Sequence, residues 1–254
     1  MSTSEGGANI VRDGLVFYVD GANRKSYVPG STSANDLSDG GITGSLINDT
    51  NFSTDNQGIW NFDGLDDRLE INELVDITSS LGNSTFNIWV NPQENGVSSE
   101  YQWCFTTNAL YPVIGLVYIP PSDVTNPGSY RIFSGNDTIG SDGWDLRTTG
   151  TVFQREWTNV CITKESGGTA GNKHNCKIYV NGVEQNTNLI DTSTQDWWMD
   201  NMSLTRFNFA SLYREPLQEL YSQTDISSFS VYNRTLSSSE ILQNYNALKT
   251  RFRY

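Results

Sequence analysis

The feature of this sequence that most constrains its fold is a series of short apolar segments in which every second residue is polar. The clearest is TFNIWVN at Thr85–Asn91, which places Phe86, Ile88 and Val90 on one face and stops at Pro92. A period of two is typical of a β-strand that buries one face and exposes the other. We therefore predict a strand here.

Similar segments recur along the chain, separated by Gly, Pro, Asn and Asp residues that favour turns. The other predicted strands are Gly14–Asp20, Leu46–Ile47, Ile59–Asp63, Arg68–Ile71, Tyr101–Thr107, Val113–Ile119, Tyr130–Phe133, Trp157–Lys164, Cys176–Asn181, Ser203–Ala210 and Ile226–Tyr232. Because no helical segments alternate with them, the pattern favours an all-β sandwich over a βαβ fold. We assign residues 10–254 to one domain and residues 1–9 to a flexible arm.

The pattern changes after the last predicted strand. Ser237 stands three residues before Glu240, and apolar residues then recur at helical spacing from 241 to 248. Ser followed by Glu at this distance is the capping box of a helix start. We predict one short helix here, with Lys249, Arg251 and Arg253 near its negative C-terminal end.

The balance of charge restricts the class of partner. The formal net charge is −13, so the chain has no basic face with which to neutralise phosphates. Nucleic acids and anionic membranes are therefore disfavoured as partners. The first residues lack a basic start followed by an apolar run, and no stretch approaches the ~20 apolar residues of a membrane span. We therefore expect neither a signal peptide nor membrane insertion.

The chain has few cysteines and histidines, which makes a zinc site or a network of disulfides unexpected. The chain has three cysteines and a single histidine, His174, too few for a typical zinc site. Cys161 and Cys176 fall in strands that we predict to form one hairpin. They are either a disulfide pair or two small buried thiols, and the missing export signal favours thiols.

Two loops combine carboxylates with tryptophan. They are SGNDTIGSDGWD at residues 134–145 and DTSTQDWWMDN at residues 191–201. Carboxylate oxygens suit Ca²⁺, and an indole face can stack on a sugar ring. The candidate glycan-binding residues are Trp144, Trp197, Trp198, Asp142, Asp145 and Asp196; the candidate Ca²⁺ ligands are Asp137, Asp142, Asp191, Asp196 and Asp200. Asp and Gly are also ordinary turn residues, so the alternative is two structural loops with one of the adjacent tryptophans buried.

Six blocks of sequence carry a resemblance to a known family. They are GLVFYVDGANRKSY at Gly14–Tyr27, NFDGLDDRLEI at Asn61–Ile71, TFNIWVNP at Thr85–Pro92, WTNVCITK at Trp157–Lys164, KIYVNGVE at Lys177–Glu184 and SVYNRTLSSSEILQNYNALKTRF at Ser230–Phe252. In this order they resemble concanavalin A-like, laminin-G-like jelly-roll modules. The combination is similar to stand-alone structural proteins of tailed phages, marine and cyanobacterial ones included.

The resemblance implies a jelly-roll β-sandwich on the surface of a virion, assembled in the host cytoplasm. The leading hypothesis is a non-enzymatic capsid decoration protein that contacts capsid or tail proteins, with a homo-oligomer as one form it can take. The alternative is a tail- or fibre-associated adhesin that binds a host-surface glycan.

The same family includes glycoside hydrolases, so an enzyme must be considered. Such enzymes of the jelly-roll type place their acidic residues as E-x-D-x-E or E-x-D-x-x-E along one strand. A retaining pair needs carboxyl groups about 5–5.5 Å apart, and alternate residues of a strand share a face. The nearest arrangement here is Glu70 and Glu73, which has the wrong spacing and no central Asp. We therefore predict no catalytic residues, and a glycan hydrolase is the last alternative.

Overall fold

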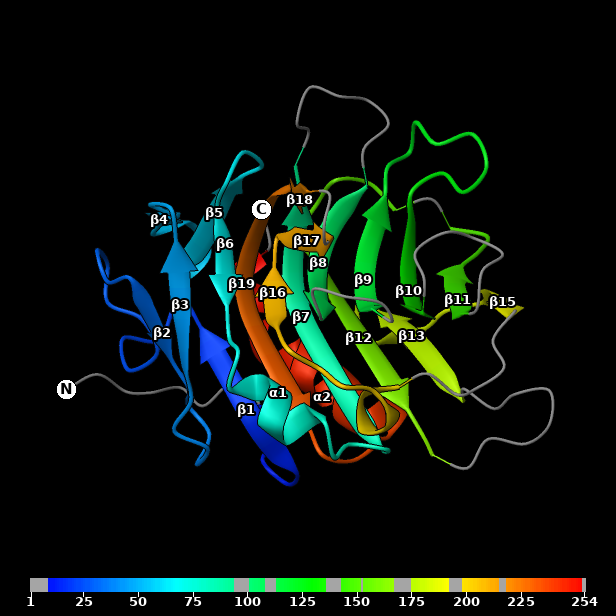
Figure 1. Cartoon of the computed structure of the whole chain (residues 1–254), viewed down its shortest axis with the longest axis horizontal. Coiled ribbons are helices and arrows are strands. Elements are labelled where there is room, and N and C mark those ends of the chain that lie inside the picture. Colours follow the sequence, from blue (N-terminus) through cyan, green and yellow to red (C-terminus); the bar gives the residue numbers. More distant parts are fainter. Residues whose placement is uncertain are drawn as a thin grey trace.

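The chain folds as a sandwich of two large antiparallel sheets, shown face-on in Figure 1. The computed structural model describes residues 9–93, 101–107, 113–135, 143–151, 153–166, 175–191, 198–214 and 218–252. Most of the strands predicted from alternation are present, which confirms the all-β sandwich. The arm predicted at residues 1–9 lies outside the described residues except for Asn9, whose carbonyl accepts a hydrogen bond from Gln243.

The first sheet, sheet A, has eight strands among the described residues, in the order β14-β13-β12-β7-β19-β5-β4, with β1 also paired to β19. Their bounds are β1 (Leu15–Asp20), β4 (Asn51–Ser53), β5 (Ile59–Asp63), β7 (Ser84–Pro92), β12 (Thr158–Lys164), β13 (Cys176–Val180), β14 (Val183–Glu184) and β19 (Gln223–Tyr232). The turn at Asn181-Gly182 joins β13 to β14, and both residues have positive φ, as a two-residue hairpin turn requires.

The second sheet, sheet B, has nine described strands in the order β15-β11-β10-β9-β8-β16-β6-β3-β2. Their bounds are β2 (Ser33–Asn35), β3 (Thr43–Ile47), β6 (Arg68–Glu70), β8 (Gln102–Thr107), β9 (Val113–Ile119), β10 (Ser129–Gly135), β11 (Gly143–Thr148), β15 (Thr187–Asp191) and β16 (Phe207–Phe209). A separate hairpin, β17 (Ser211–Arg214) and β18 (Gln218–Tyr221), lies against β8 in front of this sheet (Figure 1).

Aromatic side chains from both sheets form the centre of the core. Phe86 and Phe229 project from sheet A, and Phe105 and Phe207 project from sheet B. All four are at most 1% exposed, and their ring centroids lie 5.4 to 6.4 Å apart. Buried aromatic pairs at these distances add to the free energy of burial, so this cluster fastens one sheet to the other.

The outer face of sheet A is covered by α2 (Ser238–Leu248) and the short helix η3 (Lys249–Phe252), which lie behind the sheet in Figure 1. Phe252 stacks on Trp89 at 4.2 Å and contacts Trp157 at 4.7 Å. Trp89 on β7 and Trp157, just before β12, therefore pack under the C-terminal helices. Burying such rings is worth a few kcal/mol, so they have a structural role.

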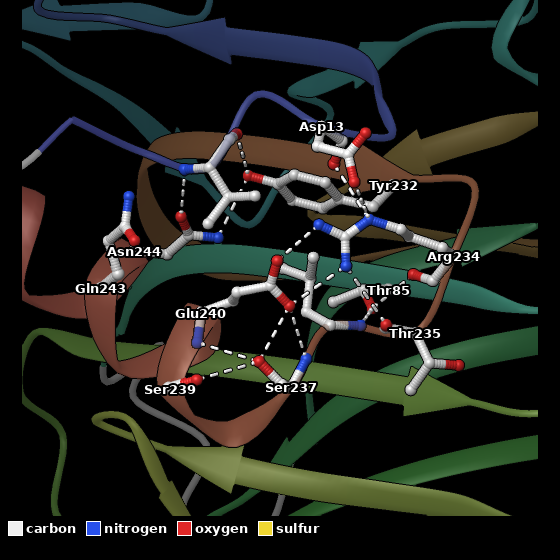
Figure 2. Close-up of polar contacts among 12 residues, drawn as sticks. Asp13, Thr85, Tyr232, Arg234, Thr235, Ser237, Ser239, Glu240, Gln243 and Asn244 are labelled. Carbon is white, nitrogen blue, oxygen red and sulfur yellow. Dashed lines mark hydrogen bonds and ion pairs between the residues drawn. The ribbon is translucent and has the colours of Figure 1, made fainter.

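The predicted capping box begins α2. Ser237 accepts a hydrogen bond from the backbone N–H of Glu240, and the Glu240 carboxylate accepts one from the backbone N–H of Ser237. Figure 2 shows that Glu240 also pairs with Arg234, which reaches Asp13 on its other side. In the same view, Asn244 accepts from the backbone of Val11 and donates to the Tyr232 hydroxyl. The helix start thus ties the two ends of the domain together.

Several features differ from the prediction. Arg251 does not serve the helix end; its guanidinium pairs with the buried carboxylate of Asp20 at 3.0 Å. Arg253 lies outside the described residues. A second helix, α1 (Leu74–Thr78), and the short helices η1 (Asp55–Gln57) and η2 (Met199–Asn201) were not predicted. These segments are too short for a period of 3.6 to emerge from the sequence. Among the described helices, none has the length and apolar character needed to traverse a bilayer.

The register of β12 and β13 excludes a disulfide between their cysteines. Cys161 lies opposite Tyr179, and Cys176 lies opposite Lys164. Cys161 packs with Tyr179 under α2, whereas Cys176 packs against the core between the sheets. All three cysteines are free thiols, as favoured, but only Cys161 of the pair is buried and Cys176 is partly exposed.

Candidate functional site

Two of the tryptophans predicted to bind a sugar lie among the described residues, and both are buried. Trp144 on β11 is 2% exposed and Trp198 is 1% exposed, and their rings stack 6.0 Å apart within the core. Neither ring face is open to a ligand, so the prediction of a sugar platform is wrong for these two residues. Trp197, Asp142 and Asp196 lie outside the described residues and stay predictions.

The predicted calcium ligands are not brought together either, as far as they are described. Asp191 ends β15 at an exposed edge of sheet B, and exposed Asp200 lies in η2, where its carboxylate approaches Gly82. Asp137 lies outside the described residues together with Asp142 and Asp196. Across the described chain, carboxylates gather within ligating distance elsewhere, at Asp63, Asp66 and Asp67.

The three carboxylates at 63–67 belong to the sequence FDGLDD, in which Asp63 ends β5 and Asp66 and Asp67 lie in the turn that follows. One oxygen from each lies within 4.8 Å of the others, a spacing that can hold a cation. Burial, with a smaller effect from the charge of Asp63, raises the pKa of Asp67 to about 6. These aspartates were not predicted as ligands, and Asp and Gly in such a sequence are also typical of a plain turn.

A second polar group was not predicted at all. Asp225 on β19 lies directly opposite Asn61 on β5 and Asn91 on β7. The adjacent residues Trp60, Val90 and Ile226 point into the core, so strand alternation turns this row to the outer face of sheet A. Three neighbouring strands thus present one carboxylate between two amides.

The carboxylate of Asp225 is held by these amides. It accepts hydrogen bonds from Asn61 at 2.8 Å, from Gln93 at 2.8 Å and from Asn91 at 3.4 Å. The Oδ1 atom of Asn91 is buried and has no hydrogen-bond partner. Burial raises the pKa of Asp225, and the three amides oppose this by stabilising the charged form.

An open pocket of about 360 Å³ lies over the row and is lined by Asn51, Asn61, Phe62, Asp63, Gln93, Gln223 and Asp225. Nearly all of these side chains end in a carboxylate or an amide, and most are at least partly exposed. Together they offer several donors and acceptors at fixed positions, because the row belongs to strands and is braced by internal hydrogen bonds. We name this group the Asp225 pocket.

Asp145, predicted as a sugar ligand, takes a different place. It follows Trp144 on β11 and therefore points to the outer face of sheet B, where it lies between Arg131 and Arg147. The Arg147 Nε donates to both carboxylate oxygens, at 2.9 and 3.0 Å. Asp145 is 5% exposed, so it forms a buried ionic cluster and not a loop ligand.

The acidic pair weighed as a catalytic candidate is not arranged for glycoside cleavage. The Glu70 carboxylate pairs with Arg68 on the same strand at 2.7 Å. Glu73 is exposed and precedes the first turn of α1, beyond the end of β6. The two glutamates therefore belong to different elements and do not face each other across one strand.

A sequence profile of the concanavalin A-like lectin/glucanases superfamily, of the laminin-G-like type, matches residues 62–242. The matched region runs from β5 to α2 and includes most strands of both sheets. The chain belongs to this superfamily. Members include binding proteins and enzymes, so membership alone does not assign an activity. No curated protein sequence matches this chain.

Solved structures with the same sandwich include binding domains of botulinum neurotoxins. The receptor-binding domain of the C/D mosaic serotype is 14% identical, with a TM-score of 0.61 over 92% of this chain and 51% of that one. The binding domain of neurotoxin DC in complex with SialylT is 12% identical, with a TM-score of 0.65 over 93% and 52%. The DC domain in complex with rat synaptotagmin II is 11% identical, with a TM-score of 0.64 over 92% and 52%. This chain thus spans about half the length of each matched chain. At such low sequence identity, the similarity extends to the fold alone.

Proposed function

We propose that this lectin-fold domain is a non-catalytic module that binds a glycan in the Asp225 pocket. The observation that carries the proposal is that Asn61, Gln93 and Asp225 line one open pocket, with Asn91 bracing Asp225 from the neighbouring strand. Sugar hydroxyls act as donors and acceptors at once, and fixed amide and carboxylate groups satisfy both roles. The proposal is supported by the neurotoxin DC binding domain solved in complex with SialylT, about half of which shares this fold.

Binding is favoured over catalysis by the state of the carboxylate. Asp225 already accepts hydrogen bonds from Asn61, Gln93 and Asn91, so its lone pairs are largely occupied. A nucleophile or a general acid needs its oxygen free toward the substrate. A carboxylate held in this way is suited to orienting neighbouring amides and accepting one further hydroxyl hydrogen bond.

The test is glycan binding by a variant that keeps the shape of the pocket. Asp225→Asn should weaken affinity by about tenfold or more, because one charge-assisted hydrogen bond is replaced by a neutral one. Isothermal titration with ligands selected on a glycan array measures the change. Glu184→Gln is the matched control, because Glu184 lies at the far edge of sheet A in an exposed pair with Lys177. Equal affinity of Asp225→Asn and the unaltered protein would refute the pocket assignment.

The proposal extends to where the module acts. The resemblance of the opening and closing blocks to phage structural proteins supports a place on the virion surface, on capsid or tail proteins. A decoration protein is our first proposal there, and a tail or fibre adhesin is the second. Neither requires more than the binding module itself.

Counting copies on purified particles distinguishes the two. Quantitative mass spectrometry against the major capsid protein, with antibody labelling, should find tens to hundreds of copies over the head for a decoration protein. A few copies at the tail would favour the adhesin and make the Asp225 pocket a host-recognition site. Absence from particles would refute both locations and leave glycan binding to be judged separately.

A further inference from the structure

The outer face of sheet B carries an ionic cluster in which, among the described residues, two arginines share one aspartate. Arg131 on β10 and Arg147 on β11 are directly opposite each other in the antiparallel pair, with Asp145 beside both. Asp145 binds Arg147 through two oxygens, while the Nε of Arg131 lies 2.7 Å from Oδ2. One carboxylate therefore serves two guanidinium groups. We call these three residues the arginine cluster.

The surplus charge is buried. The side chains of Arg131 and Arg147 are 6% exposed and that of Asp145 is 8% exposed. Like charges opposite each other on a sheet are destabilising, and an unpaired buried charge is costly. Burial accordingly lowers the pKa of Arg131, although a guanidinium stays protonated.

Hydrogen bonding at Arg131 is also incomplete. Its Nε is buried and, despite its distance from Asp145, makes no hydrogen bond of acceptable geometry. Asp123 is another carboxylate that acts on Arg147, but its Oδ1 accepts from the backbone of Thr125 and Asn126. Among the described residues, Asp123 is therefore partly committed to backbone amides, and Arg131 shares the single carboxylate of Asp145 without a well-aligned hydrogen bond at its Nε.

The surroundings indicate what kind of anion fits. The guanidinium of Arg131 lies 4.6 Å from the centre of the Phe133 ring, and Phe133 packs edge-on against Trp103 at 6.1 Å. A planar carboxylate matches the fork of a guanidinium, and an aromatic wall suits the apolar face of a sugar ring. Because so little of the cluster is exposed, a small group such as a carboxylate fits better than a bulky one.

We propose that Arg131 and Arg147 form a binding site for the carboxylate of an acidic sugar, separate from the Asp225 pocket. The two sites lie on the outer faces of opposite sheets, so each can be removed without the other. Arg131 is the primary ligand, since Arg147 is already held by Asp145. Asp145 orients Arg147 and limits the site to one negative charge.

The test compares N-acetylneuraminic acid with its methyl ester, which differ at the carboxylate, by isothermal titration. The unaltered protein should bind the acid at least tenfold more tightly than the ester, and Arg131→Met should abolish the difference. Arg68→Met is the matched control, because Arg68 lies on the same face of sheet B and pairs with Glu70, away from the arginine cluster. This control and Asp225→Asn should both keep the preference for the acid.

Unfolding measurements distinguish a ligand-binding role of Arg131 from a purely structural one. Without ligand, Arg131→Met should unfold at the same or a higher midpoint, because the surplus charge is removed. A lower midpoint together with an unchanged acid preference would overturn the proposal. Equal binding of acid and ester by the unaltered protein would also overturn it. So would binding of acetate alone as tightly as the acidic sugar. Arg131→Lys, which keeps the charge without the fork, guards against a folding defect and should retain only part of the preference.

Discussion

At the scale of single residues, the local environment decides which carboxylates are available. Asp225 lies on a strand and accepts hydrogen bonds from amides, and Asp145 pairs with arginines. Asp67 lies beside two other aspartates. All three are Asp in the sequence, yet their surroundings give them different chemistry. Counting acidic residues therefore says little about function until the neighbours are known.

Asp67 leads to a prediction on stability and pH. Its pKa is raised from 3.8 to about 6 in the folded protein, so the folded state binds a proton more tightly than the unfolded state. The destabilisation is absent below about pH 4 and complete above about pH 6. Asp67→Asn should therefore stabilise the protein by ~1–2 kcal/mol at pH 8 and by nothing at pH 4. Urea unfolding at both pH values measures this, and an equal effect at both would contradict it.

At the scale of elements, strand alternation was the reliable part of the prediction. It placed β7, β12 and β19 because each buries one apolar face along its length. It failed where structure depends on register, since Asn61, Asn91 and Asp225 are far apart in sequence and become neighbours only through pairing. Trp144 shows the same limit. Its loop composition suggested exposure, but its position on β11 turns it into the core.

The start of α2 yields a prediction at this scale. The hydrogen bond from Arg234 lowers the pKa of Glu240 to about 2, and the capping bond from Ser237 contributes to this. The stabilisation is present above about pH 4.5 and is lost as the pH falls toward 2. Glu240→Gln should cost ~1 kcal/mol at pH 7 and nothing near pH 2. Circular dichroism during urea unfolding checks it, with Glu184→Gln as an exposed-pair control.

At the scale of the whole molecule, the aromatic cluster makes the two sheets one unit. Phe229 of sheet A contacts Phe105, Phe207 and Phe209 of sheet B, with ring centroids 4.7 to 5.8 Å apart. Neither sheet can lose these contacts alone without exposing large apolar surfaces of the other. Unfolding should therefore be cooperative across the sandwich.

Phe229→Ala tests this cooperativity. We expect a loss of ~3–5 kcal/mol in the free energy of unfolding, as for other buried aromatic truncations. Tryptophan fluorescence and far-ultraviolet circular dichroism should still give coincident unfolding transitions. Leu65→Ala, at a residue 76% exposed, is a control that should change little. Separate transitions for the two probes would show that the sheets unfold independently.

The position of β19 has a consequence for biosynthesis. This strand pairs with β1, β5 and β7, all made much earlier, and it supplies Asp225 between Asn61 and Asn91. During synthesis, the chain that precedes Gln223 therefore leaves the ribosome without the strand that lies between β7 and β5 in sheet A. Nascent chains halted before residue 223 should expose the unpaired edges of β5 and β7, engage chaperones and lack the Asp225 pocket altogether.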